Sequence, residues 1–156
     1  MLGVGTKVDN FVLNDAFGNI RSLNEFIGKK VVIFFYAKNN TTGCTKEVCS
    51  FNELLAEFKN LNVEVIGISC DSVNSHYKFT NEYGLGVTLL SDQEKTVINY
   101  FGVLNVSLSK KRRIGAKRIT FILDETLKVI HRFDNVRPAN HGREVLNFIQ
   151  KLNKLS

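Results

Sequence analysis

Two cysteines lie five positions apart in the stretch TTGCTKEVCSF, which covers residues 41–51, and the only other cysteine is Cys70. A thiolate is both a strong nucleophile and a metal ligand. A close pair in a chain with so few cysteines therefore indicates redox chemistry, metal binding or a nucleophilic site. The choice depends on where the local structure places Cys44 and Cys49.

The residues around the pair predict a helix that begins near Thr42 or Gly43 and runs to about Lys59. At about 100° per residue, Cys44 shares one helix face with apolar side chains, namely Val48, Phe51, Leu55 and Phe58. Cys49 lies about 140° away, on the polar side. We expect Cys44 to face the interior and Cys49 to face water.

A position in the first helical turn changes the chemistry of a thiol. The positive end of the helix dipole and the unpaired backbone N–H groups favour the thiolate, so Cys44 is the expected nucleophile. In an intact helix, residues five apart have Cα atoms about 8.6 Å apart. A disulfide spans no more than about 7 Å between Cα atoms. The pair can bridge only if the first turns unwind.

Other interpretations of the cysteines and histidines remain open on spacing alone. Both cysteines of the pair fit ordinary helix positions. The C-x4-C spacing is not that of a zinc finger, and His76, His131 and His141 show no paired arrangement. A Cys/His nucleophile using His131 or His141 has no local signature. We interpret Cys70 as a buried structural thiol, and His76 and His141 as surface or capping residues.

Strand and helix patterns alternate along the chain. Residues 10–23 predict a hairpin with its turn at Phe17–Asn19. Further strands are predicted at 30–37, 62–70, 86–90, 118–124 and 127–133. Helix starts are predicted at Ser22, at Asp71 or Ser72, at Ser91–Asp92 and at His141. The fold class is α/β, with a central mixed β-sheet flanked by helices and an N-terminal β-hairpin.

The 41–51 stretch directly follows the first buried strand, at 30–37. In α/β sheets, functional groups gather at the carboxyl ends of central strands. The position of the cysteine pair in the chain is therefore where this fold class would place a site.

Length and composition point to a single domain over residues 1–156, with 44% hydrophobic residues. No apolar stretch is long enough to span a membrane, and the N-terminus MLGVGTKVDNF has no signal-peptide pattern. Three cysteines, an odd number, argue against a secreted disulfide framework. We expect a cytoplasmic protein that does not bind membranes.

The net charge of +6 permits weak binding to anionic surfaces, but most of the basic residues are scattered as on a solvated surface. One run, KKRRIGAKR at 110–118, is dense. We interpret it as a flexible basic loop that adds positive potential near Cys44, and we expect no specific nucleic-acid binding.

The sequence around the cysteine pair resembles that of a known protein family. The stretch YAKNNTTGCTKEVCSF, residues 36–51, resembles the active-site pattern Y-P-K-D-x-T-P-G-C-T-x-E-x-C-x-F of the peroxiredoxins of the bacterioferritin-comigratory or PrxQ type. The likeness continues in order through GKKVVIFFYA, VEVIGISCDSVNSHYKFTNEYGLGVTLLSD, YFGV, RITFILD and HGREVLNFIQKL. It covers nearly the whole chain.

The resemblance implies a thioredoxin-like fold and a thiol peroxidase that acts on hydrogen peroxide and organic hydroperoxides. It implies that Cys44 is the peroxidatic cysteine, which becomes a sulfenic acid, and that Cys49 is the resolving cysteine, which forms a disulfide with it. Thr41 would orient the peroxide, and Arg118 would stabilise the thiolate and polarise the O–O bond. Gly43 and Glu47 would line the substrate site, with Glu47 as a hydrogen-bond support.

The same resemblance implies no metal and no organic cofactor. It implies recycling by thioredoxin or a similar dithiol, and we expect a monomer, because no heptad pattern or apolar face is visible in the sequence.

Neither proline of the family pattern is present in this chain. Ala37 and Thr42 stand where the pattern has proline, which would stiffen the loop and shield the thiolate. We expect these changes to affect rate and substrate preference rather than reaction type, because Thr41, Cys44 and Arg118 are retained. Thr42 can serve instead as an additional helix cap.

Two other functions compete with the peroxidase. One is a thiol–disulfide oxidoreductase or redox sensor with slow peroxide chemistry, which the rate of reaction with peroxide would distinguish. The other is a basic chaperone-like or nucleic-acid-binding protein, which would show salt-sensitive binding that survives loss of Cys44.

Overall fold

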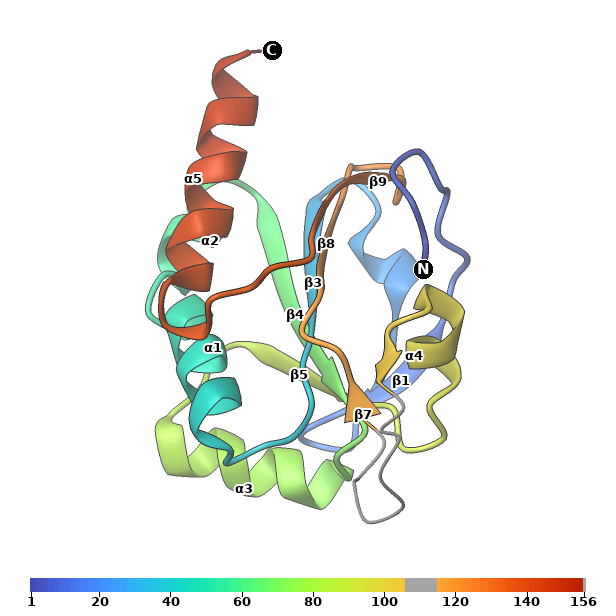
Figure 1. Ribbon diagram of the computed structural model, residues 1–156, viewed down its shortest axis with the longest axis vertical. Coiled ribbons are helices and arrows are strands. Elements are labelled where there is room, and N and C mark those ends of the chain that lie inside the picture. The colour runs from blue at the N-terminus through green and yellow to red at the C-terminus, as the bar shows by residue number, and fades with distance from the viewer. Residues whose placement is uncertain (106–114, 156) are drawn as a thin grey trace.

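The computed structural model describes residues 1–105 and 115–155 (Figure 1). Within them, seven strands form one sheet in the order β2-β1-β5-β4-β3-β8-β9. Their bounds are β1 Val12–Asp15, β2 Ile20–Ser22, β3 Lys30–Phe35, β4 Val63–Ser69, β5 Thr88–Ser91, β8 Thr120–Leu123 and β9 Val129–Phe133. A separate pair consists of β6 Leu104–Asn105 and β7 Gly115–Ala116. The basic run predicted as a loop lies outside the described residues from 110 to 114.

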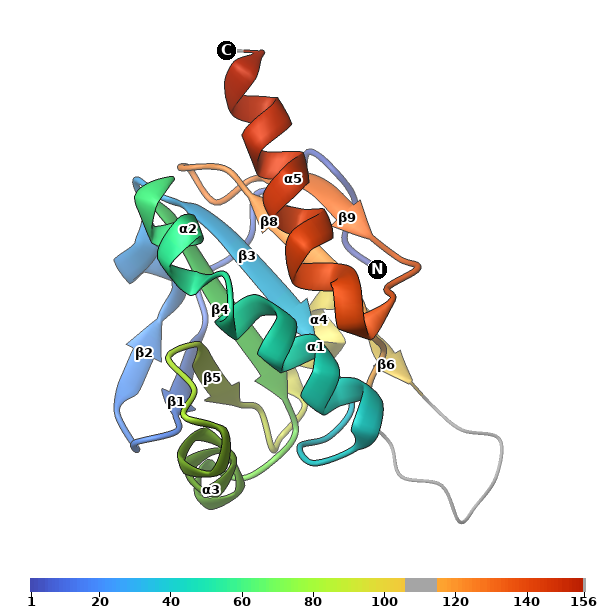
Figure 2. The same cartoon turned by 90° about the vertical axis from the view of Figure 1, so that its left-hand side faces the viewer.

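The helices are α1 Thr42–Asn52, α2 Leu55–Asn60, α3 Val73–Tyr83, α4 Thr96–Phe101 and α5 His141–Lys154, with short 3-10 helices η1 Leu23–Phe26 and η2 Pro138–Asn140. Helices α1, α2, α3 and α5 cover one face of the sheet, and α4 lies on the other (Figures 1 and 2). No helix among the described residues is long and apolar enough to cross a membrane.

Pairing within the sheet is mixed, as predicted. Strand β4 runs parallel to β3 and β5, whereas β8 runs antiparallel to β3. The amino end of β8 therefore lies beside the carboxyl end of β3. This arrangement brings residues just before β8 close to residues just after β3, although they are far apart in the sequence.

The continuous apolar run of β3 supplies both cores, because successive side chains of a strand point to opposite faces. Val31, Ile33 and Phe35 belong to the core on the α4 side. Val32 and Phe34, followed by Tyr36, belong to the core under α1, α2, α3 and α5. From Val31 to Phe35, strand β3 is thus a buried base for the segment that follows it.

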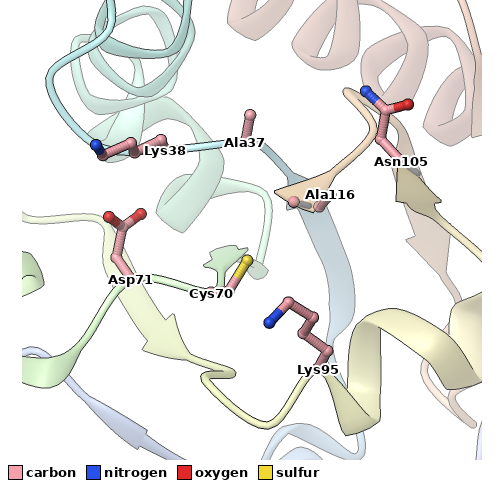
Figure 3. A pocket seen from close by; sticks show the side chains of 8 residues that line it. Ala37, Lys38, Cys70, Asp71, Lys95, Asn105 and Ala116 are labelled. Carbon is pink, nitrogen blue, oxygen red and sulfur yellow. The ribbon is translucent and has the colours of Figure 1, made fainter. Parts of the chain in front are cut away.

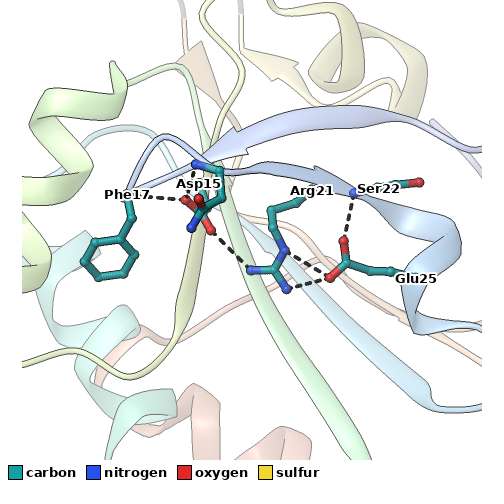
Figure 4. Close-up of polar contacts among 6 residues, drawn as sticks. Asp15, Phe17, Arg21, Ser22 and Glu25 are labelled. Atoms are coloured by element: carbon teal, nitrogen blue, oxygen red, sulfur yellow. Dashed lines mark hydrogen bonds and ion pairs between the residues drawn. The ribbon is translucent and has the colours of Figure 1, made fainter.

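The predicted N-terminal hairpin is present (Figure 4). One oxygen of Asp15 accepts hydrogen bonds from the turn amides of Phe17 (2.9 Å) and Asn19 (3.0 Å). Arg21 bridges Asp15 (3.3 Å) and Glu25 (2.7 Å), which ties the hairpin to η1. The predicted short helix after Ser22 is therefore confirmed, as a single 3-10 turn.

The helix predicted from residue 42 to Lys59 is wrong in one respect, since it is two helices. Helix α1 ends at Asn52, and the Leu54 amide donates to the Phe51 carbonyl three residues back (3.1 Å), which tightens the turn. The Asn52 side-chain oxygen accepts from the amides of Gly86 (2.7 Å) and Val87 (3.2 Å). A tertiary contact therefore fixes the break.

Helix α1 is also anchored to the start of α5. The Gly142 amide donates to Ser50 Oγ (2.9 Å). The two backbones approach so closely that a Cβ added at Gly142 would lie 2.3 Å from the Ser50 carbonyl oxygen. The carboxyl-terminal half of α1 is therefore fixed on two sides, by α5 and by the segment before β5.

Candidate active site

Cys44 and Arg118 meet at the carboxyl end of β3, and Cys49 lies further along α1. A loop at 36–41 leads from β3 into α1, and Cys44 lies in the first turn of α1. Arg118 lies just before β8, and its Nη2 lies 3.7 Å from Cys44 Sγ. The antiparallel pairing of β8 with β3 brings together these two residues, which are 74 positions apart in the chain.

Cys44 faces the interior, as predicted, with 1% of its surface exposed. Burial opposes ionisation of its thiol, but hydrogen bonds from Thr41, from the backbone of Lys38 and Ala37 and from Arg118 outweigh that effect. The pKa of Cys44 is consequently lowered from its usual value, which makes it the readier thiolate of the pair.

Thr41 is the residue that precedes α1, and it is exposed. Its hydroxyl donates to the Lys38 carbonyl (3.0 Å), and a side-chain hydrogen bond from it also lowers the pKa of Cys44. A hydroxyl has one proton and can rotate between the two acceptors. The expected cap by Thr42 is wrong, because Thr42 is the first residue of the helix itself and Thr41 precedes it.

Glu47 lies one turn further along α1 and is fully buried. Arg118 Nε is 3.3 Å from Glu47 Oε1, yet neither carboxylate oxygen has a hydrogen-bond partner within the described chain. Desolvation outweighs the attraction of Arg118 and raises the pKa of Glu47 to about 8. The carboxyl is therefore mainly neutral at neutral pH, which leaves the guanidinium charge available to the Cys44 sulfur.

Gly43 has a steric part in this arrangement. A Cβ at this position would lie 2.8 Å from Arg118 Nη2. The absence of a side chain lets the guanidinium lie against the first turn of α1, where it reaches Cys44. The structure thus brings Thr41, Gly43, Cys44, Glu47 and Arg118 into one site.

Comparison with known proteins agrees with this geometry. The family model of the AhpC/TSA family matches residues 4–132 of the chain. The chain belongs to the AhpC/TSA family. Among its relatives, the peroxiredoxin Bcp of Escherichia coli K12 is 35% identical, with 96% of this chain and 97% of that protein covered. A bcp peroxiredoxin of Coxiella burnetii is 38% identical, with 92% and 95% covered.

Solved structures show which group of the AhpC/TSA family the chain resembles. A PrxQ mutant from Xylella fastidiosa superposes with a TM-score of 0.92 at 29% identity, over 98% of both chains. The Xanthomonas campestris bacterioferritin comigratory protein gives 0.84 at 32% identity, over 90% of both chains. The chain is thus a peroxiredoxin of the Bcp/PrxQ type with a thioredoxin-like fold, and its enzyme class is thiol peroxidase.

In this peroxiredoxin Cys49 is half-buried at the edge of the core under α1, rather than facing water as predicted. Burial and the nearby Glu53 raise the pKa of its thiol. The two cysteines of α1 therefore differ in acidity in the direction that the helix geometry predicts, with Cys44 the more acidic.

Cys70 is half-buried rather than fully buried, and it lines a cavity of about 380 Å³ beyond the carboxyl ends of β3 and β4 (Figure 3). Lys95 points toward it from the start of α4, and Lys38 and Asp71 lie on the opposite side (Figure 3). Burial raises the pKa of Cys70 despite Lys95. This thiol is consequently a poorer nucleophile than Cys44.

The expectation that His76 and His141 are surface or capping residues is wrong, because both are fully buried. His141 Nε2 lies 2.7 Å from Thr120 Oγ1 and its Nδ1 lies 2.9 Å from Glu144 Oε1. His141 lies four residues before the buried Val145 and eight before the buried Ile149, so helical periodicity carried the signal.

His76 belongs to a buried polar cluster beside the loop at 36–41 that the sequence did not reveal. The cluster joins Tyr36 and Asn39 to Asp71, Ser75 and His76. His76 shares the inward face of α3 with Phe79 and Thr80, which would have indicated its burial but not its partners. No group of three or more side chains among the described residues is arranged to hold a metal ion.

Proposed function

We propose that this peroxiredoxin reduces hydrogen peroxide and small organic hydroperoxides through Cys44, with Cys49 as the resolving cysteine. The approach of Arg118 to the Cys44 sulfur, at 3.7 Å, is the observation that carries the proposal. The Xanthomonas campestris neighbour is described for its alkyl peroxide reduction activity, which supports the organic substrates.

In the first step the Cys44 thiolate attacks one peroxide oxygen. An S–O bond forms as the O–O bond breaks, and the leaving oxygen takes up a proton to become water or an alcohol. The transition state gathers negative charge on the leaving oxygen. Arg118, the Thr41 hydroxyl and the amides of the loop at 36–41 are the donors available to stabilise it.

In the second step the Cys49 thiolate attacks the sulfenic sulfur of Cys44. An S–S bond forms and hydroxide leaves, to be released as water. Because the cysteines are five residues apart, the first turns of α1 must unwind. An external dithiol, thioredoxin or a similar protein, then reduces the disulfide. The proposal includes a monomeric enzyme of one domain over residues 1–156 that acts in the cytoplasm.

Mass spectrometry of peptides after one equivalent of hydrogen peroxide tests the cysteine roles. We expect a Cys44–Cys49 disulfide in the wild type and in Cys70→Ser, and a sulfenic acid on Cys44 in Cys49→Ser. Oxidation that needs minutes or longer in all three would favour the redox sensor. A disulfide that involves Cys70 in the wild type would overturn the assignment of Cys49.

The reductant is tested separately. We expect NADPH to be consumed when peroxide, thioredoxin and thioredoxin reductase are added to the wild type, but not to Cys44→Ser. If the enzyme turned over peroxide only with glutaredoxin, glutaredoxin rather than thioredoxin would be the reductant.

A further inference from the structure

The loop at 36–41 carries several of the groups that face the Cys44 sulfur. The backbone of Ala37 and of Lys38 and the side chain of Thr41 all act to lower the pKa of Cys44, and the Thr41 hydroxyl also donates to the Lys38 carbonyl within the loop (3.0 Å). Such donors stabilise a thiolate only if they keep their direction toward the sulfur. The conformation of this loop therefore decides how much of the Cys44 thiol is ionised.

The backbone of this loop is not fixed by its own residue types. The only proline of the chain is Pro138, so no ring restricts φ between β3 and α1. Asn40 has φ of 64°, in the left-handed region that non-glycine residues seldom adopt. The shape of the loop therefore depends on hydrogen bonds, one within the loop from Thr41 to Lys38 and others to residues outside it.

Asn39 makes those contacts, and it is 5% exposed. Its amide donates to Oδ2 of Asp71 (3.0 Å), two residues after the end of β4. Its side-chain oxygen accepts from the Tyr36 hydroxyl (2.7 Å). Its side-chain nitrogen lies 3.1 Å from Ser75 Oγ and 3.0 Å from His76 Nδ1, both on α3. One residue thus joins the two ends of the loop to each other, and joins the loop to Asp71 and to α3.

The partner groups are themselves fixed. His76 Nε2 lies 3.1 Å from the Leu90 carbonyl of β5, so Nε2 carries the proton and Nδ1 is the acceptor for Asn39. Burial lowers the pKa of His76, which keeps the ring neutral and this acceptor available. Asp71 also accepts from Ser69 Oγ (2.6 Å) at the end of β4.

We propose that Asn39 is a positioning residue that holds the loop at 36–41 against α3, so that the amides of Ala37 and Lys38 point at the Cys44 sulfur. It takes the part that proline would play in a stiffer loop. It touches neither the sulfur nor the peroxide, and it acts through the backbone on either side of it. The proposal rests on the role given to Cys44 above.

The test uses a Cys49→Ser/Cys70→Ser background, in which Cys44 is the only thiol. Asn39→Leu removes the side-chain hydrogen bonds at similar volume. Ser75→Ala removes one partner, and Asn81→Leu, on the exposed side of α3, is the matched control. For each protein we would measure the Cys44 pKa from thiolate absorbance, the second-order rate constant with hydrogen peroxide, and stability in urea.

We expect Asn39→Leu to raise the Cys44 pKa by about one unit and to slow the peroxide reaction about tenfold at neutral pH. Ser75→Ala should shift both in the same direction by less, and Asn81→Leu should leave both unchanged. A merely structural role predicts lower stability with an unchanged thiol titration, and that result would overturn the proposal.

Two further outcomes are decisive. If Asn39→Leu does not fold, the Cys44 pKa of Ser75→Ala is the test. A Cys44 pKa in that variant equal to that of the parent protein overturns the proposal. If Cys44 of the parent protein does not react with peroxide, the proposed function fails, but the titration needs no peroxide and still tests Asn39.

Discussion

Three ionisable side chains, those of Cys44, Glu47 and Arg118, lie together at the amino-terminal end of α1. The charge of each depends on the charges of the others. The Cys44 sulfur raises the pKa of Glu47, so an ionised Glu47 would in turn disfavour the thiolate. A neutral Glu47 avoids this and leaves Arg118 to act on the sulfur. At the scale of single residues, the site therefore works with one anion, one cation and one buried neutral acid.

Replacing Glu47 by glutamine should remove a pH dependence of stability. The folded pKa of about 8 lies above the ordinary 4.5, so the native state holds the proton after the unfolded chain has released it. The wild-type free energy of unfolding should thus fall, relative to Glu47→Gln, by on the order of a few kcal/mol as pH rises from about 4.5 to about 8. Urea denaturation across that range measures the difference, and parallel profiles would contradict it.

Replacing Arg118 by lysine keeps the charge but loses the planar group that contacts two partners. The guanidinium presents Nη2 to Cys44 and Nε toward Glu47, and an ammonium cannot do both. We expect the peroxide rate constant to fall about a hundredfold, and the Cys44 pKa to rise. Stopped-flow kinetics checks the rate, with Lys117→Arg on the exposed neighbour as control.

How far the site was predictable differs from residue to residue. The inward direction of Cys44 followed from helical periodicity, and Arg118 followed from a family motif. The neutral state of Glu47 could not be predicted from the sequence, because it depends on the full burial of that side chain. The contacts of Asn39 could not be predicted either, because its partners on α3 lie 36 and 37 positions away and no periodicity connects them.

At the scale of elements, the two halves of α1 are held differently. Ser50 and Asn52, in its last turn, bind backbone amides of α5 and of the segment before β5. In its first turn, the contacts described for Cys44 come from the loop at 36–41 and from Arg118. Unwinding that brings Cys49 to Cys44 should therefore stop before Ser50.

Gly142→Ala should weaken the anchored half. A methyl group there would lie 2.3 Å from the Ser50 carbonyl oxygen, so α1 and α5 must move apart. We expect a loss of stability of about 1–3 kcal/mol in urea denaturation. Gly3→Ala, where a Cβ meets nothing within 4 Å, is the matched control and should change little. Equal stability of the two variants would contradict the close packing of these helices.

The elements themselves were largely predictable. The apolar runs of β3 and β4 indicated buried strands, and the residues before α3 indicated a cap at Asp71 or Ser72, of which the structure has Ser72. The break between α1 and α2 could not be predicted locally, because Asn52 is engaged by amides 34 and 35 positions further along. Tertiary contacts override local helical preference in that segment.

At the scale of the whole molecule, the mixed sheet is what assembles the site. Parallel strands β3, β4 and β5 place the ends of β3 and β4 at one edge, and β8 joins β3 antiparallel. A parallel β8 would place Arg118 at the opposite end of β3. The likeness to PrxQ and to the bacterioferritin comigratory protein extends over 90% or more of the chain, so this arrangement is shared by the fold as a whole.

The unequal anchoring of α1 has a consequence for proteases. Lys46 is exposed and lies between the two cysteines, inside a helix that resists trypsin. Unwinding after oxidation should open the bond that follows Lys46, whereas cleavage at Lys59 in α2 should not change. Limited trypsin digestion before and after peroxide measures this, and Cys49→Ser should show no increase.

The two fragments made by that cut, residues 1–46 and 47–156, each carry one cysteine of the pair. They would remain joined by the disulfide and migrate as one chain until a reductant separates them. Cleavage that occurs only after oxidation, and that is seen only on a reducing gel, would leave a permanent break in the backbone. The break would mark each molecule that had been oxidised, even after its disulfide was reduced.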